Sequence, residues 1–286
     1  MKQADEPDGT PLDRERVQDL GEPPVDRRKL IQDALACRPR PISAHTYVRR
    51  WETSSKPVAL LCDDGQAYIT KARQNGKPEM SRVMITEQVV ARLGALLDAS
   101  VSRAALVQVS AELIGAQKEM NHMEAGVCHG SRQLDDVSEH SGFQHVQVPE
   151  NRMRFARLAV LYGWVSAADH QFVYSKSSPH LVYSVDHGHF FPNGFNWNTA
   201  SLTQAGVARL DSTIAQNCKF SDLEIRGAIR QLLNANDKAI AEIVAVPPDE
   251  WGLSLDERVA LSDFLATRAA QLLASIPPDP NQEGNI

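Results

Sequence analysis

The sequence predicts an α+β fold with two lobes, the first rich in strands and the second mostly helical. Short β-prone runs separated by turn residues fill residues 42–71 and return at 106–109, which is the pattern of a small sheet. Beyond residue 151, apolar residues recur mainly with the helical period. We therefore assign residues 27–135 to an N-terminal lobe, a β-sheet plus one helix, and residues 136–275 to a helical C-terminal lobe.

The clearest local signal in the N-terminal lobe is a hairpin. The runs 58–62 and 67–70 flank residues 63–66, which contain an Asp-Gly pair. Such a pair between two β-prone runs favours a tight turn. Lys71 closes the second of these strands.

A helix is predicted over residues 84–98, where Val89 and Leu93 lie on one apolar face. Thr86 is expected to cap the start of this helix, which would put Glu87 in its first turn.

The later part of the chain alternates between helical segments and one further hairpin. The predicted elements are a loop-rich stretch over 111–148 with a strand near 125–128, a helix over 151–165, a hairpin of 171–174 and 181–185, and helices over 199–275, the longest at 256–274. Asp169 falls in the loop before this hairpin, and Asp186 follows it directly.

Composition limits the classes of protein that the chain can represent. Residues 1–26 and 276–286 are polar or rich in proline and are predicted to be disordered tails. A net charge of −6 argues against a general nucleic-acid or anionic-membrane surface. The chain has no apolar stretch long enough to cross a bilayer and no basic-then-apolar leader pattern, so a cytoplasmic location is expected. Its four cysteines include no C-x-x-C pair and are interpreted as reduced thiols.

Four residues with informative chemistry occur in the order Lys71, Glu87, Asp169 and Asp186. Kinase-type phosphotransferases present their functional groups in this order. Lys71 could reach the phosphates of ATP, and Glu87 could hold that lysine through an ion pair. Asp186, followed by a histidine and then Gly188, suits a carboxylate that holds a metal, and Asp169 suits a catalytic base.

Each of these residues also has an ordinary structural explanation. A lysine at the end of a strand is usually solvated, a glutamate in a first helical turn complements the helix dipole, and an aspartate in a loop often caps a turn. The order of the four residues along the chain favours the joint functional interpretation.

The chain resembles a HipA-like kinase of the compact, stand-alone branch. The resemblance covers roughly residues 42–275 and is carried by the strand that ends at Lys71, by the segments 86–94 and 168–171, and by 185–191. The C-terminal segments 246–251 and 264–268 also fit this branch.

The resemblance implies a bilobed protein-kinase-like fold and an ATP- and magnesium-dependent transfer of phosphate to a hydroxyl. By that similarity Lys71 binds ATP, Asp169 is the base and Asp186 binds the metal. The acceptor would be a serine or threonine of a protein or a small molecule. No direct contact with nucleic acid is expected, and the family suggests an antitoxin-like protein partner.

Two departures from the kinase pattern leave an alternative open. Tyr174 stands five residues after Asp169, where these kinases usually place an asparagine that binds a second metal, so either Gln171 or Ser175 substitutes for that ligand or one metal site is lost. No G-x-G-x-x-G precedes Lys71, and the turn at 62–66 carries two acids. A catalytically degenerate, nucleotide-binding interaction module is therefore the alternative within this family.

A different class of enzyme is indicated by the histidines. Asp186, His187 and His189 place three metal-ligating side chains within four residues, and imidazole with carboxylate suits zinc, manganese or iron. A transition-metal-dependent hydrolase is the second enzyme hypothesis, although no H-E-x-x-H pair accompanies these residues.

Overall fold

The computed structural model describes residues 25–138 and 141–276. The two predicted tails therefore lie largely outside the described residues. Where they overlap, Asp26 caps the first helix through a bond to the Lys29 amide, and Ile276 packs against the main core. These two residues thus belong to the folded part of the chain.

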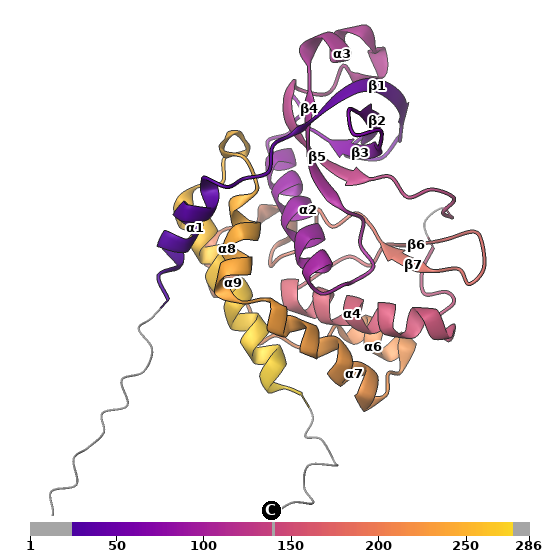
Figure 1. Cartoon of the computed structure of the whole chain (residues 1–286), viewed down its shortest axis with the longest axis vertical. Helices are drawn as coiled ribbons and strands as arrows, with labels where there is room; N and C mark the ends of the chain where they lie inside the picture. Colours follow the sequence, from indigo (N-terminus) through magenta and orange to yellow (C-terminus); the bar gives the residue numbers. More distant parts are fainter. Residues whose placement is uncertain (1–24, 139–140, 277–286) are drawn as a thin grey trace, which may run out of the picture.

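The strands of the N-terminal lobe close into a barrel in the order β1-β2-β3-β5-β4 (Figure 1). These strands are β1 (Ile42–Arg50), β2 (Val58–Cys62), β3 (Ala67–Lys71), β4 (Ala104–Val109) and β5 (Gly126–Arg132). Neighbouring strands are antiparallel except for β1 and β4, which pair in parallel. The hairpin of β2 and β3 forms as predicted, and the barrel encloses a small apolar core that includes Val58, Leu60 and Val107.

The helix α2 (Glu79–Leu96) runs beneath the barrel, and most of its residues are buried. It begins five residues before the predicted start, because Met80 and Val83 extend its apolar surface and are buried. The expected cap at Thr86 is therefore wrong: this hydroxyl lies inside the helix and donates to the Arg82 carbonyl oxygen at 2.9 Å. Proline at position 78 stands at the N-cap and gives no side-chain cap, so the true start carries little sequence signal.

Two helices differ from the sequence-based outline of the N-terminal lobe. α1 (Arg27–Leu35) packs against α8 (Asp237–Ala245) and α9 (Leu255–Ala274), which belong to the helical part (Figure 1). α3 (Ala111–Ala116) follows β4 directly, where a loop was predicted, and its start is capped by Ser110.

The helical lobe is built around α4 (Pro149–Val165) and α9. Its other elements are the hairpin of β6 (Phe172–Tyr174) and β7 (Val182–Ser184), the short helices α5 (Thr199–Thr203), α6 (Ser212–Cys218) and α7 (Asp222–Ile229), and 3-10 turns at Gly194–Asn196, Arg230–Asn234 and Asp249–Trp251, whereas the 3-10 turn at Lys118–Met120 belongs to the barrel lobe. The large core shared by α2, α4 and α9 buries Trp164, Trp197 and Trp251. Phe190 and Phe191 are also buried, beneath the turn that follows β7.

The close approach of α4 to the chain before α6 explains one glycine. A Cβ atom on Gly163 would lie 2.0 Å from the carbonyl oxygen of Arg209, so no larger residue fits there without a backbone shift. The contact brings the end of α4, and with it the loop that carries Asp169, against α6.

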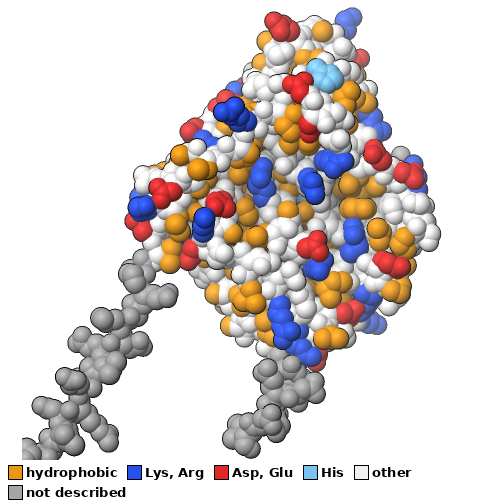
Figure 2. All heavy atoms as spheres, in the orientation of Figure 1, with side chains coloured by type: hydrophobic (Ala, Val, Ile, Leu, Met, Phe, Trp, Pro, Cys, Tyr) orange, Lys and Arg blue, Asp and Glu red, His pale blue; other side chains and the backbone are white. Residues whose placement is uncertain are grey.

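The face seen in Figure 2 carries both signs of charge, with several Lys and Arg side chains across its middle, below the barrel. Within the described residues, no helix is both long enough and apolar enough to cross a membrane.

Candidate functional site

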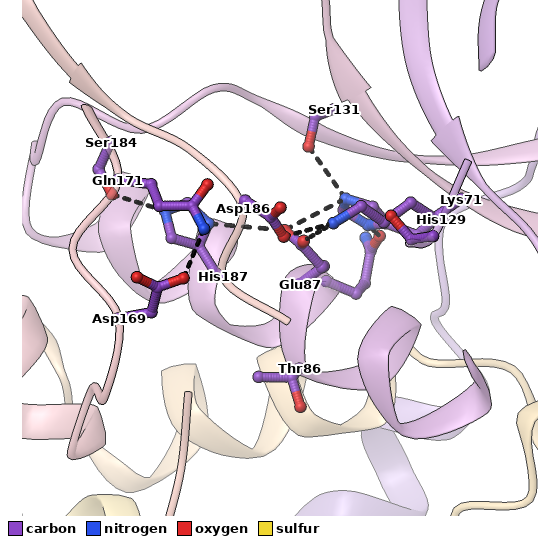
Figure 3. A network of polar contacts seen from close by, with 12 residues as sticks. Lys71, Thr86, Glu87, His129, Ser131, Asp169, Gln171, Ser184, Asp186 and His187 are labelled. Atoms are coloured by element: carbon purple, nitrogen blue, oxygen red, sulfur yellow. Dashed lines mark hydrogen bonds and ion pairs between the residues drawn. The ribbon is translucent and has the colours of Figure 1, made fainter. Parts of the chain in front are cut away.

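The predicted lysine, glutamate and metal-turn aspartate meet where the barrel faces the helical lobe (Figure 3). The ammonium of Lys71, at the end of β3, lies 2.5 Å from Glu87 Oε1 and 2.7 Å from Asp186 Oδ1. The side chains of Lys71 and Glu87 are only 8% and 3% exposed, whereas that of Asp186 is 40% exposed. The structure therefore joins three elements, β3, α2 and the turn after β7, through one buried cation.

The charges of this cluster stabilise one another. Burial alone would lower the pKa of Lys71, but the carboxylates of Glu87 and Asp186 outweigh it and hold that pKa above its usual range. Burial would likewise raise the pKa of Glu87, and the nearby Lys71 ammonium instead holds it below its usual range. Both groups are therefore ionised at neutral pH.

The turn at Asp186 has an unusual backbone. Asp186 adopts a left-handed conformation with φ of 57°, which costs a non-glycine residue free energy and occurs often at functional sites. Two residues on, Gly188 packs directly on α2: a Cβ atom there would lie 2.8 Å from Val83 Cγ1. The turn is thus fixed against the helix that carries Glu87.

Asp169 and Gln171 lie beside this turn. The Gln171 amide nitrogen donates to Asp169 Oδ2 at 2.5 Å, and the Gln171 carbonyl accepts from the Val185 amide at 3.1 Å. The neighbouring His170 is held by Asp211, the N-cap of α6, at 2.9 Å. The predicted base and the predicted second ligand are therefore adjacent to each other and tied to the segment that leads into Asp186.

Tyr174 and Ser175, by contrast, are engaged elsewhere. The Tyr174 hydroxyl is buried, donates to the Gly142 carbonyl and accepts from the Gln144 amide, both at 2.9 Å. Ser175 accepts from the Leu181 amide at 2.8 Å within the β6–β7 hairpin. Of the two substitutes considered for the missing asparagine, only Gln171 lies next to Asp169.

The strand register shows which loop accompanies Lys71. Leu61 pairs with Ala67, so the turn at 63–66 lies at the far end of the strands, about 13 Å from Lys71 at ~3.3 Å per residue. Its two acids therefore do not lie over Lys71. Val58 pairs with Thr70, which brings the β1–β2 connection at 51–57 beside Lys71 instead.

The β1–β2 connection is held in place by side chains from the segment after β3. Lys77 Nζ donates to the Ser54 carbonyl and Gln74 Nε2 donates to the Ser55 carbonyl, both at 2.6 Å. His122 contacts the Lys56 carbonyl at 2.9 Å. The sequence contained no glycine signature for this loop, so only the strand register identifies it.

The two histidines of the metal-hydrolase hypothesis have different surroundings. His187 is buried, with Nε2 2.8 Å from Ser184 Oγ and Nδ1 3.6 Å from Glu87 Oε2. His189 is exposed, and its ring lies edge-on to Phe195 with 5.1 Å between centroids. Across residues 25–138 and 141–276, no group of three or more His, Cys, Asp or Glu side chains is arranged to hold a metal ion.

A further buried histidine was missed by the sequence analysis. His129 of β5 lies 4.0 Å from Glu87 Oε2, and burial lowers its pKa to about 4, so the ring is neutral. When the Gln88 amide oxygen accepts from the Arg92 guanidinium, the Gln88 nitrogen donates to His129 Nδ1 at 2.9 Å. The Nε2 proton of His129 then points toward Ser131 Oγ, at 3.0 Å. A lone histidine on a strand gives no sequence signal for this role, because the contact is set by barrel closure.

Fold and site together have the form of a kinase: a strand-rich lobe with a buried Lys–Glu pair sits above a helical lobe that carries two loop aspartates. A family model described as "HipA-like kinase" matches residues 47–280. The chain belongs to the HipA-like kinase family, as the sequence resemblance indicated, and has the bilobed protein-kinase-like α+β fold.

Comparison with known proteins adds two similar structures. The Golgi casein kinase, at 12% sequence identity, is matched over 87% of this chain and 76% of that chain with a TM-score of 0.45. The Golgi casein kinase with Mn/ADP bound, also at 12% identity, is matched over 86% and 75% with the same TM-score. None of the curated proteins matches the chain.

Proposed function

We propose that the protein is an ATP- and magnesium-dependent phosphotransferase that transfers the γ-phosphate to a hydroxyl group. The observation that carries this proposal is the buried Lys71 ammonium, which lies within 2.7 Å of carboxylates from α2 and from the turn after β7. A phosphotransferase needs a fixed cation of this kind between a helix and a metal-holding carboxylate. Membership of a kinase family supports the same conclusion.

The donor groups suit magnesium with nucleotide phosphates. Asp186 uses one oxygen for Lys71 and remains 40% exposed, so its carboxylate is open to a metal. Gln171 adds an amide oxygen nearby, since its nitrogen is directed to Asp169. Carboxylate and amide oxygens are the hard ligands that magnesium prefers. When bound, magnesium would neutralise charge on the phosphates of ATP.

The chain's own residues would divide the remaining work. Lys71 would contact the α- and β-phosphates, and Glu87 would keep its ammonium in place. The backbone of the 51–57 loop would lie over the phosphates, because that loop sits at the same end of the barrel as Lys71. Asp169 would accept a hydrogen bond from the acceptor hydroxyl and orient it. The acceptor itself is a serine or threonine of a protein, or a small molecule, and an antitoxin-like partner remains part of this proposal.

The experiment combines nucleotide binding with phosphate transfer. We expect ATP with Mg²⁺ to raise the melting temperature of the wild-type protein, and Asp186→Asn to reduce that shift strongly. Asp169→Asn should bind ATP normally but lose transfer of labelled γ-phosphate to serine and threonine peptides, to small alcohols and to the protein itself. Asp33→Asn, an exposed aspartate of α1, is the matched control.

The outcomes separate the alternatives. Binding of ATP without any transfer would favour the degenerate, nucleotide-binding module. Stabilisation by Zn²⁺ or Mn²⁺ alone, with no response to ATP, would favour the hydrolase hypothesis and contradict the proposal.

A further inference from the structure

A series of polar contacts leads from the helical core to Glu87, and Figure 3 shows its part from Ser184 through His187 to Glu87. The Tyr162 hydroxyl of α4 lies 2.7 Å from Ser184 Oγ of β7, and Ser184 Oγ lies 2.8 Å from His187 Nε2. The other ring nitrogen, His187 Nδ1, faces Glu87 Oε2 at 3.6 Å. All four side chains are buried, so water does not compete freely for these contacts.

The chemistry of these groups determines which of them donates and which accepts in each contact. His187 Nδ1 faces the Glu87 carboxylate at 3.6 Å, whereas Nε2 lies 2.8 Å from the Ser184 hydroxyl, a group that is able to donate to it. A lone pair on Nδ1 would face the ionised Glu87 carboxylate, which is itself an acceptor only. The proton therefore belongs on Nδ1, and Nε2 must accept from the Ser184 hydroxyl. Ser184 Oγ in turn accepts from the Tyr162 hydroxyl.

The carboxylate of Glu87 needs such an orienting group. Its Oε1 oxygen holds Lys71 at 2.5 Å, whereas the contacts of Oε2 with His187, at 3.6 Å, and with His129, at 4.0 Å, are longer. The His187 contact is longer than a hydrogen bond, but an N–H dipole directed at a buried anion is favourable in a medium of low dielectric constant. His187 also directly follows Asp186 in the sequence, and Asp186 is the second carboxylate that contacts the Lys71 ammonium.

We propose that His187 is a positioning residue, which uses Tyr162 and Ser184 to hold its Nδ1 proton toward Glu87 and thereby fixes Lys71 for nucleotide binding. This inference rests on the proposed function, because Lys71 is taken as the phosphate-binding residue. It gives the histidine after Asp186 a role in orienting charge, in place of the metal ligation that the hydrolase hypothesis required.

Three substitutions separate this role from simple packing. His187→Asn keeps an amide donor near the position of Nδ1, His187→Gln keeps a polar group near that of Nε2, and His187→Phe keeps only the ring. We expect the His187→Gln and His187→Phe variants to raise the dissociation constant for ATP with Mg²⁺ about fivefold. The His187→Asn variant should keep that constant near the wild-type value. Equal affinity of all three variants with the wild type, or equal losses in all three, would overturn the inference.

A second measurement does not depend on nucleotide. The ¹⁵N resonances of the imidazole rings report the tautomer of each histidine, and the His187 signals are assigned by their loss in His187→Asn, with His45→Asn, an exposed residue of β1, as the labelling control. We expect His187 to be protonated on Nδ1 and His129 on Nε2. An Nε2-protonated or doubly protonated His187 at neutral pH would overturn the inference even if ATP binds.

The two measurements also distinguish failure of the inference from failure of the proposed function. If the wild type does not bind ATP, the proposed function fails whatever the tautomer. If the wild type binds ATP but His187 is not protonated on Nδ1 alone, or the three variants do not differ in affinity as expected, only the proposed role of His187 fails.

Discussion

Replacing Lys71 by methionine would leave the Glu87 carboxylate buried without its closest cation. The two side chains are 8% and 3% exposed and only 2.5 Å apart, so the solvent can do little to compensate. Removing one partner of a buried pair costs about 3–5 kcal/mol because the other charge stays desolvated. Two neutral imidazoles near Glu87 relieve part of this cost, so we expect a loss of about 3 kcal/mol in the free energy of unfolding at pH 8.

A double variant tests whether the cost comes from the stranded charge. Lys71→Met with Glu87→Leu replaces both members of the pair by apolar side chains, which is often nearly neutral for stability. We expect this double variant to be within about 1 kcal/mol of the wild type, far from the sum of the two single changes.

The stability difference between the wild type and Lys71→Met should also depend on pH in a defined direction. In the wild type the pKa of Glu87 lies below its usual range, so the pair contributes its stability above the unfolded-state pKa, near 4.3, and loses it as the pH falls through the folded value. In Lys71→Met the desolvated carboxylate would have a raised pKa, and its penalty would grow as the pH rises through that value. The difference in stability between wild type and variant should therefore be smaller at pH 5 than at pH 8.

Equilibrium unfolding in urea, followed by tryptophan fluorescence, measures the stability loss of Lys71→Met, that of the double variant and the pH dependence of the difference. The probe is suitable because Trp164, Trp197 and Trp251 are buried in the main core. The reasoning would be refuted by a loss below about 1 kcal/mol in Lys71→Met at pH 8, by additive single and double changes, or by a difference that widens at pH 5.

Further predictions concern packing and exposure. Gly163→Ala would force a Cβ atom to 2.0 Å from the Arg209 carbonyl oxygen and should lower the free energy of unfolding by about 3 kcal/mol, whereas Gly115→Ala, with open space around it, should be neutral or slightly stabilising in urea unfolding. Gly188→Ala would press on the α2 valine at 2.8 Å, and should lower the stability by ~1–2 kcal/mol and weaken ATP binding in calorimetry. Cys37 is exposed while the other three cysteines are buried, so a thiol reagent at pH 8 should titrate one thiol quickly in the native protein and four after unfolding; rapid reaction of more than one native thiol would contradict the burial.

The local parts of the fold could be predicted from the sequence because short-range chemistry determines them. The turn between β2 and β3 follows from an Asp-Gly pair, and the β6–β7 hairpin and α9 follow from their periodicity. The start of α2 could not be placed, because three of its first four residues are polar and proline at position 78 offers no side-chain cap. The packing of α1 on α8 and α9 depends on contacts more than 200 residues apart, among them Arg27 with Asp237 at 2.7 Å.

The candidate site, like the fold, has some features that the sequence predicts and others that only tertiary contacts determine. The order of Lys71, Glu87, Asp169 and Asp186 along the chain was sufficient to suggest a cluster, and the structure brings Lys71, Glu87 and Asp186 into direct contact. The loop beside Lys71 could not be identified, because strand register and not composition decides which turn lies at that end of the barrel. His129 and the tautomer of His187 depend on tertiary contacts that no spacing reveals.

A crystal structure with Mg²⁺ and a non-hydrolysable ATP analogue tests the central claim most directly. We expect the metal about 2.1 Å from an Asp186 oxygen and a phosphate oxygen in contact with the Lys71 ammonium, beside the 51–57 loop. A nucleotide bound away from Lys71, or a metal held by His187 or His189 and not by Asp186, would contradict the account.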